Sequence, residues 1–263
     1  MTTRKVGAAT TAAAIAVLAF LALPIVIIFP LALSPSEYLT FPPQGLSLRW
    51  LETVLASADW RGSIWLSLRI ALGATALAVV LSVLAALALV RGRFRFKQLV
   101  YALILLPMIV PNIISAIAMF FFFADAGGAF GSTLAIVIGH AVVSLPIAVI
   151  ILSATLQGVD GRLEHAALSL GANRYTAFRR ITLPLIAPGI ASACIFAFLS
   201  SFDELLIAMF MAGSTAQTLP VRIWNSVLFQ LDPTIAAVSA LLVVVSVLAL
   251  LAANLLARRG ART

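Results

Sequence analysis

Long apolar stretches alternate with short polar segments along the whole chain. Each stretch provides the roughly 20 residues that a helix needs to cross the apolar core of a bilayer. The stretches occupy residues 8–31, 63–90, 99–123, 133–156, 185–211 and 235–257. The pattern therefore predicts an all-α integral membrane protein with six transmembrane helices.

The first apolar stretch follows Arg4 and Lys5, as the apolar region of a signal peptide would. Its length exceeds the roughly 7–15 residues of such a region, and no small-residue cleavage site follows it. We therefore expect this stretch to remain as a transmembrane helix.

The composition agrees with a membrane protein and excludes several other classes. Hydrophobic residues make up 63% of the 263 residues and charged residues only 10%, against roughly 25% charged residues in soluble domains. One globule of this size cannot bury so much apolar surface. Soluble enzymes, secreted disulfide scaffolds and disordered regulators are excluded, and the single Cys194 permits no internal disulfide.

The net charge of +8 is concentrated in alternate connections between the apolar stretches. Thirteen of the 17 basic residues share this distribution: Arg4, Lys5, Arg91, Arg93, Arg95, Lys97, Arg162, Arg174, Arg179, Arg180, Arg258, Arg259 and Arg262. Basic connections face the cytoplasm in membrane proteins, so both chain termini are predicted to be cytoplasmic. This role explains the charge, and we expect no nucleic-acid partner.

The outer connection, residues 32–62, is longer than a hairpin needs. Prolines and Gly45 interrupt regular structure in its first half, and Leu48–Ala56 predicts a short amphipathic helix on the membrane surface. Trp50, Trp60 and Trp65 are suited to an interfacial belt.

The inner connection, residues 157–190, carries the most specific pattern. We predict a first helix from Arg162 to about Leu170, capped by Asp160, and a bend at Gly171. A second helical stretch should run through Arg180, with a turn at Pro184.

The first of these helices carries four apolar residues on one face, which needs a cover. These are Leu163, Ala166, Ala167 and Leu170. Lipid headgroups or the protein's own helix bundle would provide a purely structural cover.

The inner connection contains the triplet His165-Ala166-Ala167, then Gly171 four residues later, and then Ile181-x-Leu183-Pro184. These residues resemble the "EAA…G…I-LP" loop of permease subunits of bacterial ABC importers that are served by a binding protein. The resemblance implies that residues 157–183 couple the permease to a cytoplasmic ATPase.

One position departs from the family pattern. His165 stands where the family has a glutamate, and Glu164 directly precedes it. One residue along a helix turns the side chain by about 100°, so either Glu164 or His165 could contact the ATPase.

Further segments resemble the polyamine (spermidine/putrescine) subfamily of these permeases. They read LPMIVPNIISAIAM, SFDELLIAMFMAG and TLPVRIWNSVLFQLDPTIAAVSALLV. The resemblance implies a type I importer fold, with an N-terminal helix and periplasmic segment (1–61), a five-helix core (62–257) and a cytoplasmic tail (258–263). It also implies three partners: an ABC ATPase dimer, a periplasmic substrate-binding protein and a second permease, which would be a paralogue rather than a copy.

The chain lacks the motifs that ATP hydrolysis or metal binding would need. Lys5 and Lys97 are its only lysines, and neither stands in a G-x-x-x-x-G-K-[ST] phosphate loop. The two histidines, His140 and His165, form no metal-binding pattern. We expect no enzyme activity and no cofactor on this chain, and His140 is interpreted as a hydrogen-bonding residue of helix packing.

Charged residues within an apolar stretch indicate function by default, and Asp203 and Glu204 are the clearest case. On a continuous helix Asp203 would share a face with Phe196, Ser200, Ile207 and Phe210, and Glu204 would point about 100° away. We expect one of the two to face a solute pathway, with Phe196 and Ser200 beside Asp203. The structural alternative is an ion pair with Arg69 or Arg222.

Pro107 and Pro111 should bend the stretch 99–123 or open its backbone. Broken helices are where transporters often place solutes, so the adjacent Asn112 is a candidate solute contact. The alternative is that the prolines only bend the helix for packing and contact no solute.

These expectations favour one function over two other functional classes. We expect a permease of the bacterial inner membrane that moves a small polar, cationic, polyamine-like solute, driven by a separate ATPase. An ion-coupled secondary transporter would need its own coupling-ion site. A membrane enzyme is the third class, but no catalytic constellation can be assembled from these residues.

Overall fold

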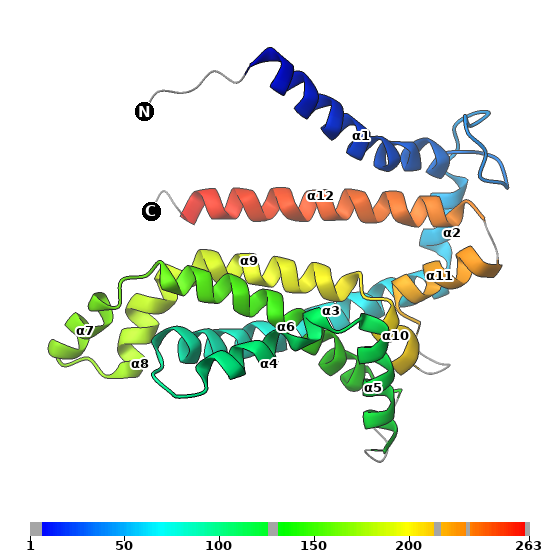
Figure 1. The fold of residues 1–263 in the computed structure, drawn as a ribbon. Coiled ribbons are helices and arrows are strands. Elements are labelled where there is room, and N and C mark those ends of the chain that lie inside the picture. Colours follow the sequence, from blue (N-terminus) through cyan, green and yellow to red (C-terminus); the bar gives the residue numbers. More distant parts are fainter. Residues whose placement is uncertain (1–6, 126–130, 213–216, 230–231, 261–263) are drawn as a thin grey trace. The chain divides into compact units, whose positions relative to one another are not determined.

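The computed structural model describes residues 7–125, 131–212, 217–229 and 232–260 (Figure 1). Every regular element in these ranges is helical, as the hydropathy pattern predicts. The chain divides into two compact units, one formed by residues 1–61 with 223–263 and the other by residues 62–222.

The first unit contains α1 (Ala8–Ala32), α2 (Arg49–Ala56) and α12 (Thr234–Gly260), and α12 packs against both other helices. The short helix predicted at Leu48–Ala56 is present as α2. Trp50 is buried, and its indole Nε1 donates to the Ser36 carbonyl oxygen at 3.0 Å. Trp50 therefore packs inside the protein.

The second unit contains most of the helices. They are α3 (Ala58–Arg91) from Gly62 onward, α4 (Lys97–Ile109), α5 (Asn112–Asp125), α6 (Thr133–Gln157), α7 (Arg162–Ser169), α8 (Arg174–Ala177), η1 (Phe178–Thr182), α9 (Leu183–Phe202), α10 (Leu206–Met211) and the start of α11 (Leu219–Phe229). Figure 1 shows α7 and α8 at one end of α9 and α10 at its other end.

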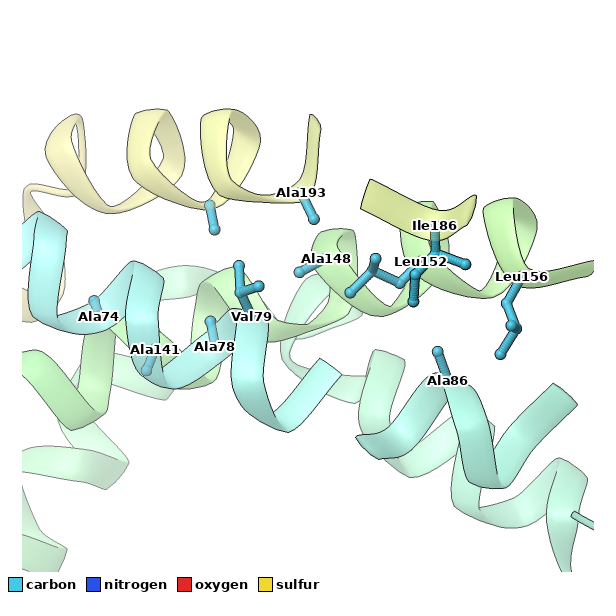
Figure 2. Close-up of a cluster of buried hydrophobic side chains, with 11 residues drawn as sticks. Ala74, Ala78, Val79, Ala86, Ala141, Ala148, Leu152, Leu156, Ile186 and Ala193 are labelled. Atoms are coloured by element: carbon cyan, nitrogen blue, oxygen red, sulfur yellow. The ribbon is translucent and has the colours of Figure 1, made fainter. Parts of the chain in front are cut away.

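The core between α3, α6 and α9 is built largely from alanine (Figure 2). Its alanines are Ala74, Ala78, Ala86, Ala141, Ala148, Ala193 and Ala197. Small side chains let helix backbones approach closely, and such packing stabilises helix pairs in a membrane, where burial of apolar surface provides little net drive.

Helices α6 and α9 pack tightly at Gly189. A Cβ atom on Gly189 would lie 2.7 Å from the Thr155 Cβ, and the Thr155 hydroxyl is itself bonded to the Ile151 carbonyl at 2.8 Å. Replacing Gly189 with alanine should therefore cost about 1–3 kcal/mol of stability. The measurement is thermal unfolding of the purified protein in detergent. Gly62→Ala, where nothing lies within 4 Å of the new Cβ, is the control, and equal melting temperatures for the two variants would contradict the close packing.

Within the residues that the structure describes, four helices are long and apolar enough to cross a membrane: Thr10–Ala32, Ala58–Arg91, Thr133–Gln157 and Arg174–Phe202. A fifth crossing is available if α4 and α5 act together, although their axes are bent by 103°. The break follows Ile109 and contains Pro111, so the predicted interruption of the stretch 99–123 is confirmed. The described apolar part of α12, Thr234–Val247, is shorter than a full span, and the sixth crossing stays a prediction.

Two predictions about the stretch around α9 are wrong. The turn expected at Pro184 is absent, because α8, η1 and α9 form one continuous helix from Arg174 to Phe202. In the π-helical turn η1 the Leu183 N–H bonds to the Phe178 carbonyl five residues back, and Pro184, which has no N–H, lies in the first turn of α9. The predicted continuous helix 185–211 ends at Phe202 and resumes at Leu206.

Candidate functional site

The segment that includes α7 has the local structure expected for it. The Asp160 carboxylate accepts a hydrogen bond from the Arg162 N–H at 2.9 Å and so caps α7. Gly171 has a φ of +90°, a conformation that favours glycine. The apolar face of α7 has no complete cover within the unit, since Leu163 is 46% and Leu170 90% exposed.

Glu164 is bound within its own chain. One carboxylate oxygen, Oε1, accepts from Arg91 Nε at 3.2 Å and from the Thr182 hydroxyl at 3.0 Å. A second guanidinium nitrogen of Arg91 donates to the Val159 carbonyl at 2.8 Å. These contacts tie α7 to the end of α3 and to η1, whereas the neighbouring His165 is exposed.

Among the other predicted coupling residues, Ala166, Gly171 and Pro184 are exposed, and Ala167, Ile181 and Leu183 are half-buried. The sequence did not identify Arg91 and Thr182 as partners of Glu164. Arg91 was assigned only a topological role, and it lies 73 residues from Glu164 in the chain.

Beside α7 lies a cavity of about 360 Å³. Arg91, Glu164 and Thr182 contribute to its wall, and His165 and Arg174 line it as well. It contains two of the predicted coupling residues, Glu164 and His165.

The second cavity, also of about 360 Å³, lies where two helices are broken. Asn112 enters it from the start of α5, Ser200 from the end of α9, and Asp203 and Glu204 from the break between α9 and α10. Four of the five predicted pathway residues therefore come together. Phe196 is 49% exposed and is not part of the cavity lining.

Glu204 forms the break by capping α10. Its carboxylate accepts from the N–H groups of Leu206 at 3.2 Å, Ile207 at 2.7 Å and Ala208 at 3.3 Å. A helix N-terminus offers such unpaired N–H groups and favours negative charge. Because the helix is interrupted here, Ile207 and Phe210 do not continue the helical face of Asp203, as a continuous helix would require.

The neighbours of Glu204 also differ from those considered on sequence grounds. His140 Nε2 lies 3.8 Å from the Glu204 carboxylate, and His140 Nδ1 is hydrogen-bonded to the Ser201 hydroxyl at 2.9 Å. The Arg69 guanidinium lies over the Trp65 ring, 5.8 Å from its centroid. Glu204 is only 7% exposed, whereas Asp203 is exposed, so the two acids occupy different environments.

The match to a known family covers residues 78–262, and the family is described as "Binding-protein-dependent transport system inner membrane component". The chain belongs to this family. It is therefore a multi-pass inner-membrane permease of an ABC importer and not an enzyme, because a partner subunit hydrolyses ATP. This membership decides against the ion-coupled transporter and the membrane enzyme.

Relatives of the permease are named for several different solutes. It is 29% identical to the spermidine/putrescine transport system permease protein PotC of Escherichia coli, over 92% of this chain and 91% of that protein. It is 34% identical to the putrescine transport system permease protein PotI of the same species (81% and 79%). A molybdenum transport system permease protein, ModB, from Mycobacterium bovis is 36% identical (76% and 79%).

Solved structures confirm the fold of the permease. A bacterial ABC transporter that imports the acidic polysaccharide alginate superposes with a TM-score of 0.70 at 18% identity, covering 95% of this chain and 94% of that one. An inward-facing MetNI methionine ABC transporter gives 0.63 at 19% identity (76% and 94%). The type I permease fold inferred from the sequence is thus confirmed.

Proposed function

We propose that the permease moves a small, polar, cationic solute of the polyamine class and is driven through α7 by a separate ATPase. The observation that carries this proposal is the Asp203 carboxylate in the cavity with Asn112 and Ser200. The Glu204 carboxylate oxygens already accept hydrogen bonds from the N-terminus of α10. Asp203 is therefore the acid available to a solute.

The chemistry of the cavity suits an amine. A protonated amine donates strong hydrogen bonds to a carboxylate, and the Asn112 amide and Ser200 hydroxyl provide further oxygen acceptors. The cavity also lies at two helix breaks, between α4 and α5 and between α9 and α10, and transporters often place solutes at broken helices. A volume of about 360 Å³ is sufficient for a small molecule.

The named relatives support a polyamine but do not carry the argument alone. PotC and PotI are named for spermidine and putrescine, whereas the similarly related ModB is named for molybdenum. The acidic cavity favours the first two.

Coupling is proposed to run through residues 157–183. The small Ala166, Ala167 and Gly171 permit close approach of a partner, and exposed apolar residues on α7 require one. In this assembly an ABC ATPase dimer, a periplasmic binding protein and a paralogous second permease complete the importer. One solved relative, the alginate transporter, was crystallised with a ligand-bound periplasmic protein.

We also propose that the chain consists of an N-terminal helix with a periplasmic segment (1–61), a transmembrane core (62–257) and a cytoplasmic tail (258–263), with both termini in the cytoplasm. Residues 1–6 and 261–263 lie outside the described part of the chain. Affinity purification of the tagged permease, followed by mass spectrometry, tests the partners directly.

Replacing Asp203 with asparagine should reduce uptake of a cationic solute by about tenfold, because a charged hydrogen bond contributes about 1.5–3 kcal/mol. The measurement is ATP-driven uptake of labelled putrescine into proteoliposomes that contain the whole importer and saturating binding protein. Asp203→Glu should retain most of the activity. Asp125→Asn, a change at an exposed acid that does not line the cavity, is the control, and unchanged uptake by Asp203→Asn would sink the proposal.

A further inference from the structure

The cavity beside α7 combines apolar walls with charged side chains. Leu87 from α3, Leu168 from α7 and Phe178 from η1 provide the apolar surface. His165 and Arg174 add basic groups from α7 and α8. The proposed docking of α7 on an ATPase does not by itself explain this arrangement.

The charges of the cavity do not balance. Among the described residues that line it, Glu164 is the only acidic one, and it is already paired with Arg91 and hydrogen-bonded to Thr182. In the described part of the chain, the Arg174 guanidinium and the His165 ring have neither a hydrogen bond nor an ion pair, and both residues are exposed. The cavity is therefore a positively charged recess.

We infer that this cavity receives an acidic side chain, aspartate or glutamate, from the partner ATPase. The carboxylate would pair with Arg174 and accept a hydrogen bond from His165, and its aliphatic stem would lie against Leu168 and Phe178. This inference rests on the proposed function, because it assumes that α7 docks on the ATPase. It also assigns the outward polar contact to His165 and Arg174 and an internal role to Glu164.

The surroundings of the cavity favour a protein over a lipid headgroup. Leu163 on α7 is 46% exposed, Tyr175 on α8 is 68% exposed, and Leu170, directly after α7, is 90% exposed. A docked protein would cover these residues together with the cavity, whereas a single phosphate would fill only the cavity. Exposed apolar groups around a charged recess are typical of protein interfaces.

Charge reversal at Arg174 tests the inference. The permease is placed in nanodiscs of neutral lipid, and binding of its ATPase, the one recovered with the tagged permease, is measured by titration. Arg174→Glu should weaken binding by about tenfold or more, because an acid from the ATPase would face a like charge. Folding should not suffer, since Arg174 begins α8 and an acidic residue is favourable at a helix N-terminus. Arg95→Glu changes the net charge equally at an exposed residue outside the cavity and should alter binding little.

A second arm identifies the partner group. Acidic residues of the ATPase are changed one at a time to arginine, and one of these changes should restore binding to Arg174→Glu but not to wild type. The inference is overturned if Arg174→Glu binds the ATPase as tightly as Arg95→Glu does, or if no reversal on the ATPase restores binding. It is also overturned if the effect of Arg174→Glu requires anionic lipid, which would indicate a headgroup phosphate as the ligand.

The outcome separates this inference from the proposed function. A wild-type permease that binds no ATPase would contradict both. A wild-type permease that binds the ATPase, with an Arg174→Glu variant that binds it equally well, would contradict only the acidic side chain in the cavity.

Discussion

Replacing Glu204 with alanine should lower the free energy of unfolding by about 3 kcal/mol and stop solute uptake. The variant loses three hydrogen bonds to the N-terminus of α10, and helix caps and charged hydrogen bonds contribute on this scale. Without the cap, the break that holds Asp203 in the cavity has no support. Thermal unfolding in detergent and uptake by the reconstituted importer measure the two effects.

The adjacent residue provides the matched control for Glu204. Asp203→Ala removes an exposed acid whose side chain makes no hydrogen bond to a helix end within the described residues, so the melting temperature should stay close to that of the wild type while uptake falls. Glu204→Gln keeps one oxygen acceptor and should have intermediate stability. Equal melting temperatures for Glu204→Ala and Asp203→Ala would show that the cap does not support α10.

Replacing Glu164 with alanine should uncouple ATP hydrolysis from transport, with uptake reduced by at least about tenfold while the ATPase still binds. The side chains of Glu164 and Arg91 are only 25% and 28% exposed, and losing one member of such a pair costs about 1.5–3 kcal/mol. The change frees α7 from α3 and η1, so movement of α7 would no longer reach these helices. The measurement is the ratio of solute transported to ATP hydrolysed.

Two further variants distinguish coupling from a general loss of structure. Arg91→Ala should have the same effect as Glu164→Ala, and the double variant should be little worse than either single one, because both remove the same interaction. Glu164→Gln can still accept from Arg91 and Thr182 and should recover part of the coupling. Arg93→Ala, at an exposed neighbour, should transport normally. Additive losses in the double variant would argue against a shared role.

Local signals in the sequence were sufficient for the features that depend on neighbouring residues. Asp160 and Gly171 predicted the start and the end of α7, because a cap and a positive φ are properties of a few adjacent residues. Pro111 predicted the break between α4 and α5 for the same reason. The amphipathic spacing at Leu48–Ala56 predicted α2.

Features that depend on distant or competing contacts were not predictable in this way. The apolar run 185–211 predicts one helix, since hydropathy does not reveal that the Glu204 side chain competes for the N–H groups of the next turn. From the sequence, Arg91 is one of the basic residues that orient the protein in the membrane. Only the fold shows that it lies beside Glu164. Pro184 predicts a turn because proline interrupts a regular α-helix. The sequence does not reveal that the preceding turn, η1, is π-helical.

The continuous helix from Arg174 to Phe202 has a mechanical consequence. Its 29 residues correspond to a length of about 43 Å at 1.5 Å per residue, with one end beside α7 and the other directly before Asp203. If it moves as a stiff lever, a tilt of about 10° pivoting at the α8 end would displace the Asp203 end by about 7.5 Å, from the same length estimate. A small rotation imposed at α7 would then be amplified into a large change in the width of the cavity lined by Asp203.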